Sequence, residues 1–597
     1  MIAAFVLLVL CTLAPAALSV PPRPPVRCGG DGDGDAGCVL SNAYGAWSSD
    51  RADCPVAAVA YPASERDVVA AVARASAGGM RVKAVSGFAH TIPKLACPGG
   101  NGSAASLLIS TARYAGVEVD AAARTVTADA GAPLRAVIDA AEASGLSLPA
   151  SPYWEGVSVG GAVSTGSHGS SWWGRGGALH DDVVRLSLVV PAGAADGWAR
   201  VVPLAKGDAL FPAALVSLGL LGVISKMKHE TSPDLDPDPG HSGAGAEVQE
   251  KRDLRLQGRL HLPGRLRGPR RAPRVRRHPW YPSQHQAVYR LDDRAPLNAT
   301  GDGVNDFIGF RSTLIAVSQG VRALETALEG SRNVKGKCAM ATAEIAAKRL
   351  IGNGLRRKDG QLFTGYPVVG FQGKMQTSGS CAHSPASSPL TACAWDPRFK
   401  GLFFYESTAV FSPARFRSFI LDVKKLRDLN PDGMCGVDVY NGLLVRFVRR
   451  SEAWLGQPED SVVVDFNYYR AADPSAARLS QDVWEEVEQL AFVKHGARPH
   501  WAKNRMVAFR GVQGKYPGWA RFAAAKRQLD PRGLFDSPWS DDVVGGKELS
   551  KDDGCALDGR CVCSEDRHCS PGQGYYCRTG LVFTEARVCR YSASQLV

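Results

Sequence analysis

A glycine-rich stretch around one histidine has the residue types that could hold a reactive ligand. Five glycines, at positions 156, 160, 161, 166 and 169, fall within fourteen residues that also include Ser, Thr and His168. Without a Cβ, glycine lets the backbone come very close to a flat or phosphorylated molecule. The stretch is neither a dinucleotide-binding turn followed by an acidic residue nor a phosphate loop closed by Gly-Lys-Ser/Thr. Taken alone, a ligand cradle and a tight loop around a hydrogen-bonded His168 fit the pattern about equally well.

Motifs before and after this stretch narrow the choice. The segment Arg81-Val-Lys-Ala-Val-Ser-Gly-Phe-Ala-His-Thr91 has the pattern of a short strand that turns at Gly87 and presents His90. Far downstream lie Pro499-His-Trp-Ala-Lys503 and Leu529-Asp-Pro-Arg-Gly-Leu-Phe535. In this order the motifs resemble those of the aldonolactone oxidases in the vanillyl-alcohol-oxidase flavoprotein superfamily, most closely the plant L-gulonolactone oxidase-like proteins. The resemblance covers nearly the whole chain apart from residues 235–277.

The resemblance implies FAD as the cofactor, since no side chain can accept a hydride. His90 stands where many relatives bond the flavin covalently, but Ser86-Gly-Phe-Ala-His-Thr91 replaces the common Gly-Gly-Gly-His-Ser. A covalent link through His90 is therefore expected to be possible, with a buried structural histidine as the alternative, and His168 is expected beside the flavin. The residues that the resemblance assigns to FAD binding are Ser86, Gly87, Phe88, Ala89, His90, Thr91, Gly160, Gly161, Thr165, Gly166, Ser167, His168, Gly169, Val223 and Ile224.

The resemblance also implies a reaction in which hydride leaves C2 of a lactone for the flavin and the hydroxyl proton is lost. Negative charge then develops on oxygen, so a fixed cation should lower the barrier. Arg446 is the expected cation, although active relatives have Glu-x-Arg where this chain has Leu444-Val-Arg446. His500 and Lys503 belong to the family's His-Trp-x-Lys motif, and Lys503 is expected near the developing charge. The alternative is that Trp501 is a packing anchor and Lys503 its solvated neighbour.

The hydrophobic periodicity, together with helix-capping and turn residues, predicts an α+β fold in two main parts. Apolar spacing and caps predict helices at 64–76, 133–145, 416–427 and 476–491, and alternation predicts strands at 81–85, 117–120, 125–129, 442–448 and 462–469. By resemblance, residues 54–232 are a two-part PCMH-type FAD-binding domain. Residues 280–545 are expected to be an α+β substrate (cap) domain, with an antiparallel sheet backed by helices.

Residues 233–279 are an anomalous basic, low-complexity segment. Between Lys251 and Arg277 there are eleven Lys or Arg and one acidic residue, a surplus of ten in a chain whose net charge is +12. The run has no aromatic residue, contains three prolines and shows neither helical nor strand periodicity, which disfavours a nucleic-acid site. A GC-rich coding sequence read out of frame would give this composition, and a disordered basic loop is the other interpretation.

The N-terminus indicates secretion. Residues 2–18 are an apolar run that ends in small residues and is too short for a membrane span, so residues 1–19 are predicted to be a cleaved signal peptide and residues 20–53 an N-terminal segment. No later stretch reaches the ~18 apolar residues of a spanning helix. The sequons at Asn101 and Asn298 predict glycosylation. We expect a secreted protein of the apoplast or cell wall.

The cysteines favour the same compartment. Fourteen remain once Cys11 leaves with the signal peptide, and six of them lie in the last 43 residues. Cys561-Val-Cys563 is too tight for a zinc knuckle, so residues 546–597 are predicted to be a small disulfide-rich module without metal. The alternate Asp residues between Cys28 and Cys38 suggest a calcium loop, but Ala36 and Asn42 replace the Gly and Glu that such a loop needs at its sixth and twelfth positions. A solvated loop closed by a Cys28–Cys38 bridge is favoured.

Three functions stay open at the level of sequence. The first is FAD-dependent oxidation of L-gulono-1,4-lactone or a related aldonolactone to an ascorbate-type product, with O2 reduced to H2O2. The second is oxidation of another sugar or alcohol by a secreted member of the superfamily. The third is a catalytically weak extracellular binding protein whose Cys-rich tail attaches it to glycans or to another protein. The expected partners are a small lactone and O2, with no nucleic acid and no oligomeric state implied.

Overall fold

The computed structural model describes residues 26–29, 36–41, 53–86, 96–99, 106–152, 154–172, 177–231, 248–257, 275–295, 313–354, 369–376, 391–392, 404–471, 473, 475–503, 505–546 and 551–593. The signal peptide, the Asp-Gly repeat, both sequons and residues 87–91 lie outside these ranges, so the predictions for them stay predictions. Within the described ranges, none of the helices combines the length and apolarity needed to cross a bilayer.

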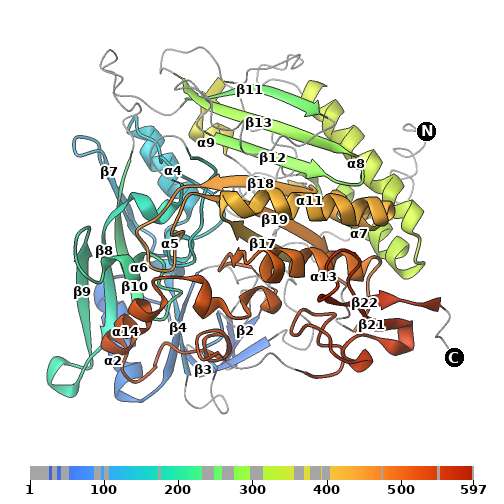
Figure 1. Ribbon diagram of the computed structural model, residues 1–597. Coiled ribbons are helices and arrows are strands. Elements are labelled where there is room, and N and C mark those ends of the chain that lie inside the picture. Colours follow the sequence, from blue (N-terminus) through green and yellow to red (C-terminus); the bar gives the residue numbers. More distant parts are fainter. Residues whose placement is uncertain are drawn as a thin grey trace.

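The N-terminal half is built from two five-stranded sheets with helix α2 packed against both (Figure 1). In the first sheet, of order β1-β2-β3-β5-β4, strands β3, β5 and β4 run parallel, and β1 and β2 are added antiparallel. The second sheet, of order β6-β7-β10-β8-β9, is antiparallel throughout. The strands are β1 (Val26–Cys28), β2 (Ala36–Ser41), β3 (Asp53–Ala60), β4 (Arg81–Val85), β5 (Ser106–Ser110), β6 (Val117–Asp120), β7 (Thr125–Asp129), β8 (Val183–Pro191), β9 (Ala199–Ala205) and β10 (Val223–Glu230).

The helices of this half follow the sequence signals closely. Helix α2 (Glu65–Ala77) begins after Ser64, whose hydroxyl accepts a hydrogen bond from the Asp67 N–H. It buries Val68, Val72 and other residues at helical spacing, and these provide the contact with the two sheets. The remaining helices are α4 (Leu134–Ala143), which begins after Pro133 as predicted, α5 (Val159–Ser164) and α6 (Phe211–Leu215).

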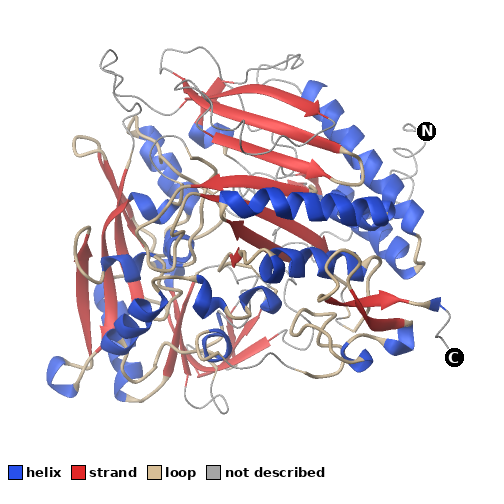
Figure 2. Cartoon of the chain, in the orientation of Figure 1, coloured by secondary structure: helices blue, strands red, loops and turns tan. Residues whose placement is uncertain are grey.

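An eight-stranded antiparallel sheet forms the second half, in the order β15-β11-β13-β12-β18-β19-β17-β20. Helices α11 (Pro413–Leu429) and α13 (Gln481–Gln489) pack against its central strands (Figures 1 and 2). Alternate residues of those strands point to the opposite face of the sheet. The strands are β11 (Val248–Gln257), β12 (Val275–Tyr281), β13 (Gln286–Ala295), β15 (Val369–Phe371), β17 (Phe404–Phe411), β18 (Leu443–Val448), β19 (Ser461–Tyr469) and β20 (Arg498–Pro499). A separate two-stranded sheet joins β14 (Thr313–Leu314) and β16 (Thr391–Ala392).

The helices of the second half are mostly amphipathic, and one predicted boundary was wrong. The helix predicted from residue 476 begins only at Gln481, because Ser480 has a left-handed backbone with φ of 50°. The helices are α7 (Ile315–Gly330), α8 (Val334–Gly354), α9 (Gln372–Met375), α11 (Pro413–Leu429), α12 (Cys435–Val439), α13 (Gln481–Gln489), α14 (Trp519–Leu529) and α15 (Pro538–Val543). A π-helical turn, Leu490–Lys494, continues α13.

The basic segment contributes strands to this sheet, although its sequence shows no strand periodicity. Strand β11 pairs with β13 on one side and β15 on the other, and β12 pairs with β13 and β18. Backbone hydrogen bonds define these pairings, and they do not require the alternation of apolar side chains that the sequence lacks. Residues 232–247 and 258–274 lie outside the described ranges.

The C-terminal module is held by three disulfides, as predicted. They join Cys555 to Cys561, Cys563 to Cys577, and Cys569 to Cys589. Strands β21 (Tyr575–Thr579) and β22 (Arg587–Tyr591) form its hairpin, and β22 packs against α13. The predicted Cys28–Cys38 bridge is also present, together with bridges Cys54–Cys97 and Cys338–Cys435.

Residues that belong in sequence to the second half also form part of the hydrophobic core of the first half. Trp501, Phe509 and Trp539 belong in sequence to the second half, yet they are buried in the hydrophobic core around α4, α5 and α6 of the first half. The backbone N–H of Val82 also donates to Leu534 O at 2.7 Å. Residues 501–543 therefore complete the N-terminal half in space.

Candidate active site

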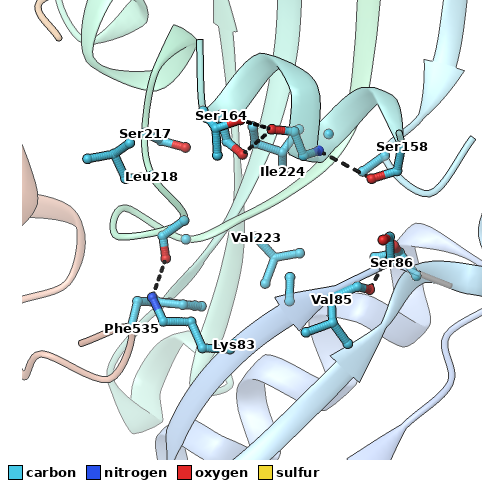
Figure 3. A pocket seen from close by; sticks show the side chains of 18 residues that line it. Lys83, Val85, Ser86, Ser158, Ser164, Ser217, Leu218, Val223, Ile224 and Phe535 are labelled. Carbon is cyan, nitrogen blue, oxygen red and sulfur yellow. Dashed lines mark hydrogen bonds between the residues drawn. The ribbon is translucent and has the colours of Figure 1, made fainter. Parts of the chain in front are cut away.

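A cavity lies where the two sheets of the N-terminal half face each other. Its walls come from the end of β4, the start of α5 and the turn that leads into β10 (Figure 3). Most of the lining is backbone or small side chains, which leaves room for a ligand along the strands. The lining residues are Lys83, Ala84, Val85, Ser86, Thr111, Ala130, Ser158, Gly160, Gly161, Ser164, Thr165, Ser217, Leu218, Gly219, Gly222, Val223, Ile224 and Phe535.

Most glycines of the predicted cradle are required by packing within the protein. A Cβ at Gly160 would lie 2.9 Å from the Ala130 carbonyl oxygen, and one at Gly169 would lie 2.9 Å from the Ser151 carbonyl oxygen. A Cβ at Gly156 would meet the Trp154 ring at 2.7 Å. Gly161 lines the cavity, and only the Ser158 hydroxyl lies close to its Cβ position. The cradle therefore depends on α5 lying close to β7, which Gly160 permits.

Two polar groups at the cavity wall fit an anionic, hydrogen-bonding ligand such as FAD. Lys83 is 2% exposed, and its Nζ has one contact, at 3.5 Å, with the Gly219 carbonyl oxygen. Burial lowers the pKa of Lys83 to about 7, against the opposing influence of Asp536. The buried Ser217 hydroxyl has no hydrogen-bond partner among the described residues. A buried hydroxyl without a partner is costly, and one long contact to a carbonyl compensates a buried ammonium poorly, so both groups are suited to contact a bound cofactor.

The predicted FAD-binding residues divide among three locations. The main cavity is lined by Ser86, Gly160, Gly161, Thr165, Val223 and Ile224. Thr165 also lines a smaller neighbouring cavity, together with Gly166 and His168. Ser167 and Gly169 line neither cavity, and their backbone N–H groups bond to Ala162 O and Gly177 O. The structure does not describe Gly87, Phe88, Ala89, His90 and Thr91, so their predicted roles stay predictions.

The segment after the cradle connects it to the cap sheet. The Ser170 hydroxyl accepts a hydrogen bond from the Phe447 N–H at 3.0 Å, and the Trp172 indole N–H donates to Val448 O and Ser461 O. Ser171 also forms a parallel bridge with Val448. These contacts place His168 opposite the face of β18 and β19 that the helices leave uncovered.

Two histidines from the two halves meet there. The rings of His168 and His500 lie 5.1 Å apart. Burial, reinforced by the charge of Arg446, lowers the pKa of His168 to about 3, and burial together with His168 and Lys503 holds the pKa of His500 well below its usual range. Both imidazoles are therefore neutral at physiological pH.

The hydrogen bonds of these histidines set different tautomers. His168 Nδ1 lies 2.8 Å from Gly169 O, so Nδ1 must donate, and Nε2 keeps a lone pair. That Nε2 is buried without a partner in the described part of the chain. His500 Nδ1 instead accepts from the Ala502 N–H, which leaves the proton on Nε2. His168 can accept a hydrogen bond from a ligand, and His500 can donate one.

Arg446 is held by a carboxylate from the neighbouring strand. Its Nη2 lies 2.6 Å from an Asp465 carboxylate oxygen, and Asp465 also accepts from the Thr408 hydroxyl. Burial would raise the pKa of Asp465, but the charges of Arg446 and Lys503 lower it below its usual value. Asp465 is the cross-strand partner of Leu444, the position at which the sequence resemblance predicts a glutamate. The carboxylate missing from the sequence motif is thus supplied from β19.

Lys503 is the second cation of this site. Its Nζ lies 3.5 Å from a Glu406 carboxylate oxygen on β17. Burial raises the pKa of Glu406, against the opposing charge of Lys503. The three predicted catalytic residues Arg446, His500 and Lys503 therefore lie in one site with His168.

Sequence reasoning missed the carboxylates of this site. Asp465 and Glu406 lie in strands that are buried along almost their whole length, and neither residue belongs to a motif. His180 was missed as well; it lines the smaller cavity, and its Nε2 lies 3.0 Å from the Ser451 hydroxyl oxygen. The sequence feature that pointed to these residues was an acidic side chain within a buried strand. That signal could not identify the partner cation.

Three family models match segments of the chain. Residues 56–195 match the FAD binding domain, residues 423–543 match D-arabinono-1,4-lactone oxidase, and residues 552–591 match the L-gulonolactone oxidase 2-like C-terminal domain. Solved cholesterol oxidases share the fold. One described as solvent-stable has a TM-score of 0.57 at 17% identity, covering 85% of this chain and 97% of its own. One from B. sterolicum has a TM-score of 0.56 at 15% identity, covering 89% and 100%.

These matches and the cavity define an FAD-dependent oxidoreductase with a PCMH-type fold. L-gulonolactone oxidase 3 of Arabidopsis thaliana is 53% identical over 584 residues, which is 97% of this chain and 96% of that protein. L-gulonolactone oxidase 5 of the same plant is 40% identical, covering 98% and 96%. Alditol oxidase from Streptomyces is 26% identical, covering 81% and 95%. The chain belongs to the L-gulonolactone oxidase family.

Proposed function

We propose that this protein oxidises L-gulono-1,4-lactone or a related aldonolactone to an ascorbate-type product, reducing O2 to H2O2, and so contributes to ascorbate biosynthesis. The names of its relatives and the match to D-arabinono-1,4-lactone oxidase support this substrate class. The observation that carries the proposal is the site itself. Two cations, Arg446 and Lys503, and two neutral histidines converge where the cofactor cavity meets the cap sheet.

FAD, when bound, supplies the hydride acceptor that side chains lack. In the described part of the chain, the groups that would hold it are the backbone of residues 160–161 and 217–224, with Lys83, Ser158 and Ser217. Thr165 lines both cavities, so it marks the place where cofactor and substrate regions meet.

Each polar group of the site has a role in this reaction. His168 Nε2 accepts the hydrogen bond of the reacting hydroxyl, and its low pKa makes it an orienting acceptor more than a strong base. His500 Nε2–H donates to a lactone oxygen. Lys503 and Arg446 stabilise the negative charge that develops on oxygen as the hydroxyl proton is lost. Asp465 fixes the Arg446 guanidinium in place.

An absorption spectrum of the purified protein tests the proposal directly. We expect flavin bands between about 350 and 500 nm that bleach anaerobically on addition of L-gulono-1,4-lactone and return with O2. In air, the H2O2 formed should equal the lactone consumed. Lys503→Ala should keep the flavin bands but lose most of the bleaching. Flavin bands that stay with the acid-precipitated protein would support a covalent bond through His90.

The same experiment separates the alternatives. Bleaching by an alditol but not by a lactone would replace the proposal with an alditol oxidase, the activity named for the Streptomyces relative. Bleaching without H2O2 would point to another electron acceptor. A protein that binds flavin but responds to no sugar derivative would favour the extracellular binding protein.

We also propose that the protein is secreted. Disulfides form and persist in oxidising compartments, and the described residues contain six of them. The apolar run at residues 2–18 is consistent with this. Expression of the full chain with a C-terminal tag should deliver a glycosidase-sensitive product to the medium. Retention inside the cell would contradict the proposal.

A further inference from the structure

The disulfide-closed loop Cys555–Cys561 lies against the segment that carries Lys503. The buried Arg505 guanidinium, 1% exposed, binds Glu488 on α13 at 2.7 and 3.1 Å and lies 3.5 Å from Leu557 O in the loop. The Val507 N–H donates to Gly559 O at 3.0 Å. The loop therefore holds the chain two and four residues beyond Lys503.

The same loop also contacts the strand that carries the partner of Lys503. Along β17, Tyr405 and Ser407 point to one face, whereas Glu406 points to the other. The Tyr405 hydroxyl donates to Asp558 in the loop at 2.5 Å, and the Ser407 hydroxyl donates to Glu488. Both ends of the Lys503–Glu406 pair are thus anchored, through residues within four positions along the chain, to the loop and to α13.

We propose that the Cys555–Cys561 loop is a positioning element of the active site, which fixes the Lys503 ammonium relative to Glu406 and the substrate. Its catalytic consequence rests on the proposed function. Without the loop, Arg505 would lose its contact with Leu557 O, and the Val507 N–H would lose its hydrogen bond to Gly559 O. The segment 500–507 would then be free to shift. A displacement of about 1 Å at a charged catalytic group can cost about 100-fold in rate. The C-terminal module then serves catalysis from within the fold, without requiring a separate binding partner.

Two glycines of the module provide a matched test. Gly559 has φ of 71°, and a Cβ there would lie 2.3 Å from the Arg505 guanidinium carbon. Gly554 has nearly the same backbone, with φ of 68°, but its Cβ would meet nothing closer than 3.9 Å. Gly559→Ala and Gly554→Ala therefore carry similar backbone strain, and only the first displaces Arg505.

The first measurement is hydrogen–deuterium exchange in the full-length protein. We expect Gly559→Ala to increase exchange at residues 500–507 and Gly554→Ala to leave it unchanged. This measurement needs no turnover, so it tests the positioning even if the protein oxidises no lactone. Equal exchange in the two variants would overturn the proposal.

The second measurement is a double-mutant cycle on kcat/KM for the lactone. Gly559→Ala should lower kcat/KM by about tenfold or more in the wild-type background, chiefly through kcat, and by less than about twofold when Lys503 is already alanine. The same loss in both backgrounds would show a merely structural loop and overturn the proposal. If Gly559→Ala does not fold, Tyr405→Phe removes the hydroxyl that bonds Asp558 in the loop, together with its bond to Arg470, and takes its place in the cycle. No turnover by the wild type would refute the proposed function and leave the exchange result to decide the positioning.

Discussion

At the scale of single residues, the site holds its arginine with a carboxylate from the neighbouring strand. Leu444 stands where the sequence resemblance predicts a glutamate, and its cross-strand partner Asp465 binds Arg446. In an antiparallel sheet, a diagonal neighbour lies within reach of a long side chain. The guanidinium is therefore fixed by a residue nineteen positions away in sequence and adjacent in space.

Asp465→Asn tests this arrangement. Removing the charge leaves the Arg446 guanidinium, whose side chain is 15% exposed, without this counter-ion. The change should cost about 2 kcal/mol of stability and lower kcat/KM for the lactone by about 10- to 100-fold. Chemical denaturation and steady-state kinetics measure the two effects. Adding Leu444→Glu to this variant should restore part of the activity, because it places a carboxylate in the row across from position 465. Wild-type kinetics in Asp465→Asn would contradict the assignment.

Lys83 gives a prediction about pH and cofactor binding. Its pKa of about 7 means that it is already charged below pH 7 and would have to take up a proton above pH 7 to carry a positive charge beside bound FAD. FAD affinity should therefore be flat below about pH 7 and fall up to about tenfold per pH unit above it. Lys83→Met should bind FAD more weakly at pH 6 and lose this dependence.

A His90→Ala background keeps the flavin exchangeable for this measurement. Titration of the apoprotein with FAD, followed by quenching of flavin fluorescence, gives the affinity at each pH. The same pH dependence in Lys83→Met and its parent would show that another group is responsible.

At the scale of elements, helix α13 holds the C-terminal module through its carboxylates. Both Glu486 oxygens accept backbone N–H groups of residues 581–583, and Glu485 accepts from the Cys589 N–H at 2.7 Å. Gln489 pairs with both backbone groups of Arg587. The module is joined to the cap by buried hydrogen bonds, in addition to its own disulfides.

Glu485 makes this attachment sensitive to pH. Burial raises its pKa to about 7, against the opposing hydrogen bond from the Cys589 N–H, so the folded form retains a proton that the unfolded chain releases above about pH 4.5. Stability should therefore fall as pH rises from about 4.5 to about 7. Relative to its parent, Glu485→Gln should gain about 3 kcal/mol of unfolding free energy across this window.

Urea denaturation at pH 4.5 and pH 8 measures the gain. Glu585→Gln, at an exposed position of the same module, serves as the control and should show no such change. A constant difference between Glu485→Gln and its parent at the two pH values would contradict the raised pKa.

At the scale of the whole molecule, the FAD-binding half is completed by the end of the chain. Trp539 is fully buried, and its ring lies 5.6 Å from Phe509 and 6.2 Å from Trp501. Trp501 adjoins His500, so the same packing that closes the core also places a site residue. Folding of the cofactor half and assembly of the site are therefore coupled.

Trp539→Ala should reveal this coupling. Loss of a fully buried Trp side chain costs about 3–5 kcal/mol, and we expect flavin retention to fall together with stability. Trp519→Ala, at a half-buried position on the rim of the same core, should cost less. Thermal unfolding monitored by flavin fluorescence and by circular dichroism compares the two. Cofactor binding that is unchanged in Trp539→Ala would show that the C-terminal segment is not part of the FAD-binding half.

The sequence by itself determined the local elements and the cofactor class. Ser64 caps a helix, Pro133 precedes one, and the strands near 81–85 and 442–448 follow from spacing within a few residues. Short motifs likewise indicated FAD and placed Arg446, His500 and Lys503 in one site. Such features depend on neighbouring residues, which a linear pattern contains.

Tertiary structure alone decided how those residues are supported. It paired Arg446 with Asp465, formed strands in the basic segment, set Gly559 against Arg505 and buried Trp539 in the cofactor half. Strand register and core packing select these partners across tens to hundreds of residues. The physical reason is that a pairing energy depends on distance in space, and no local periodicity encodes which distant strand or loop will lie alongside.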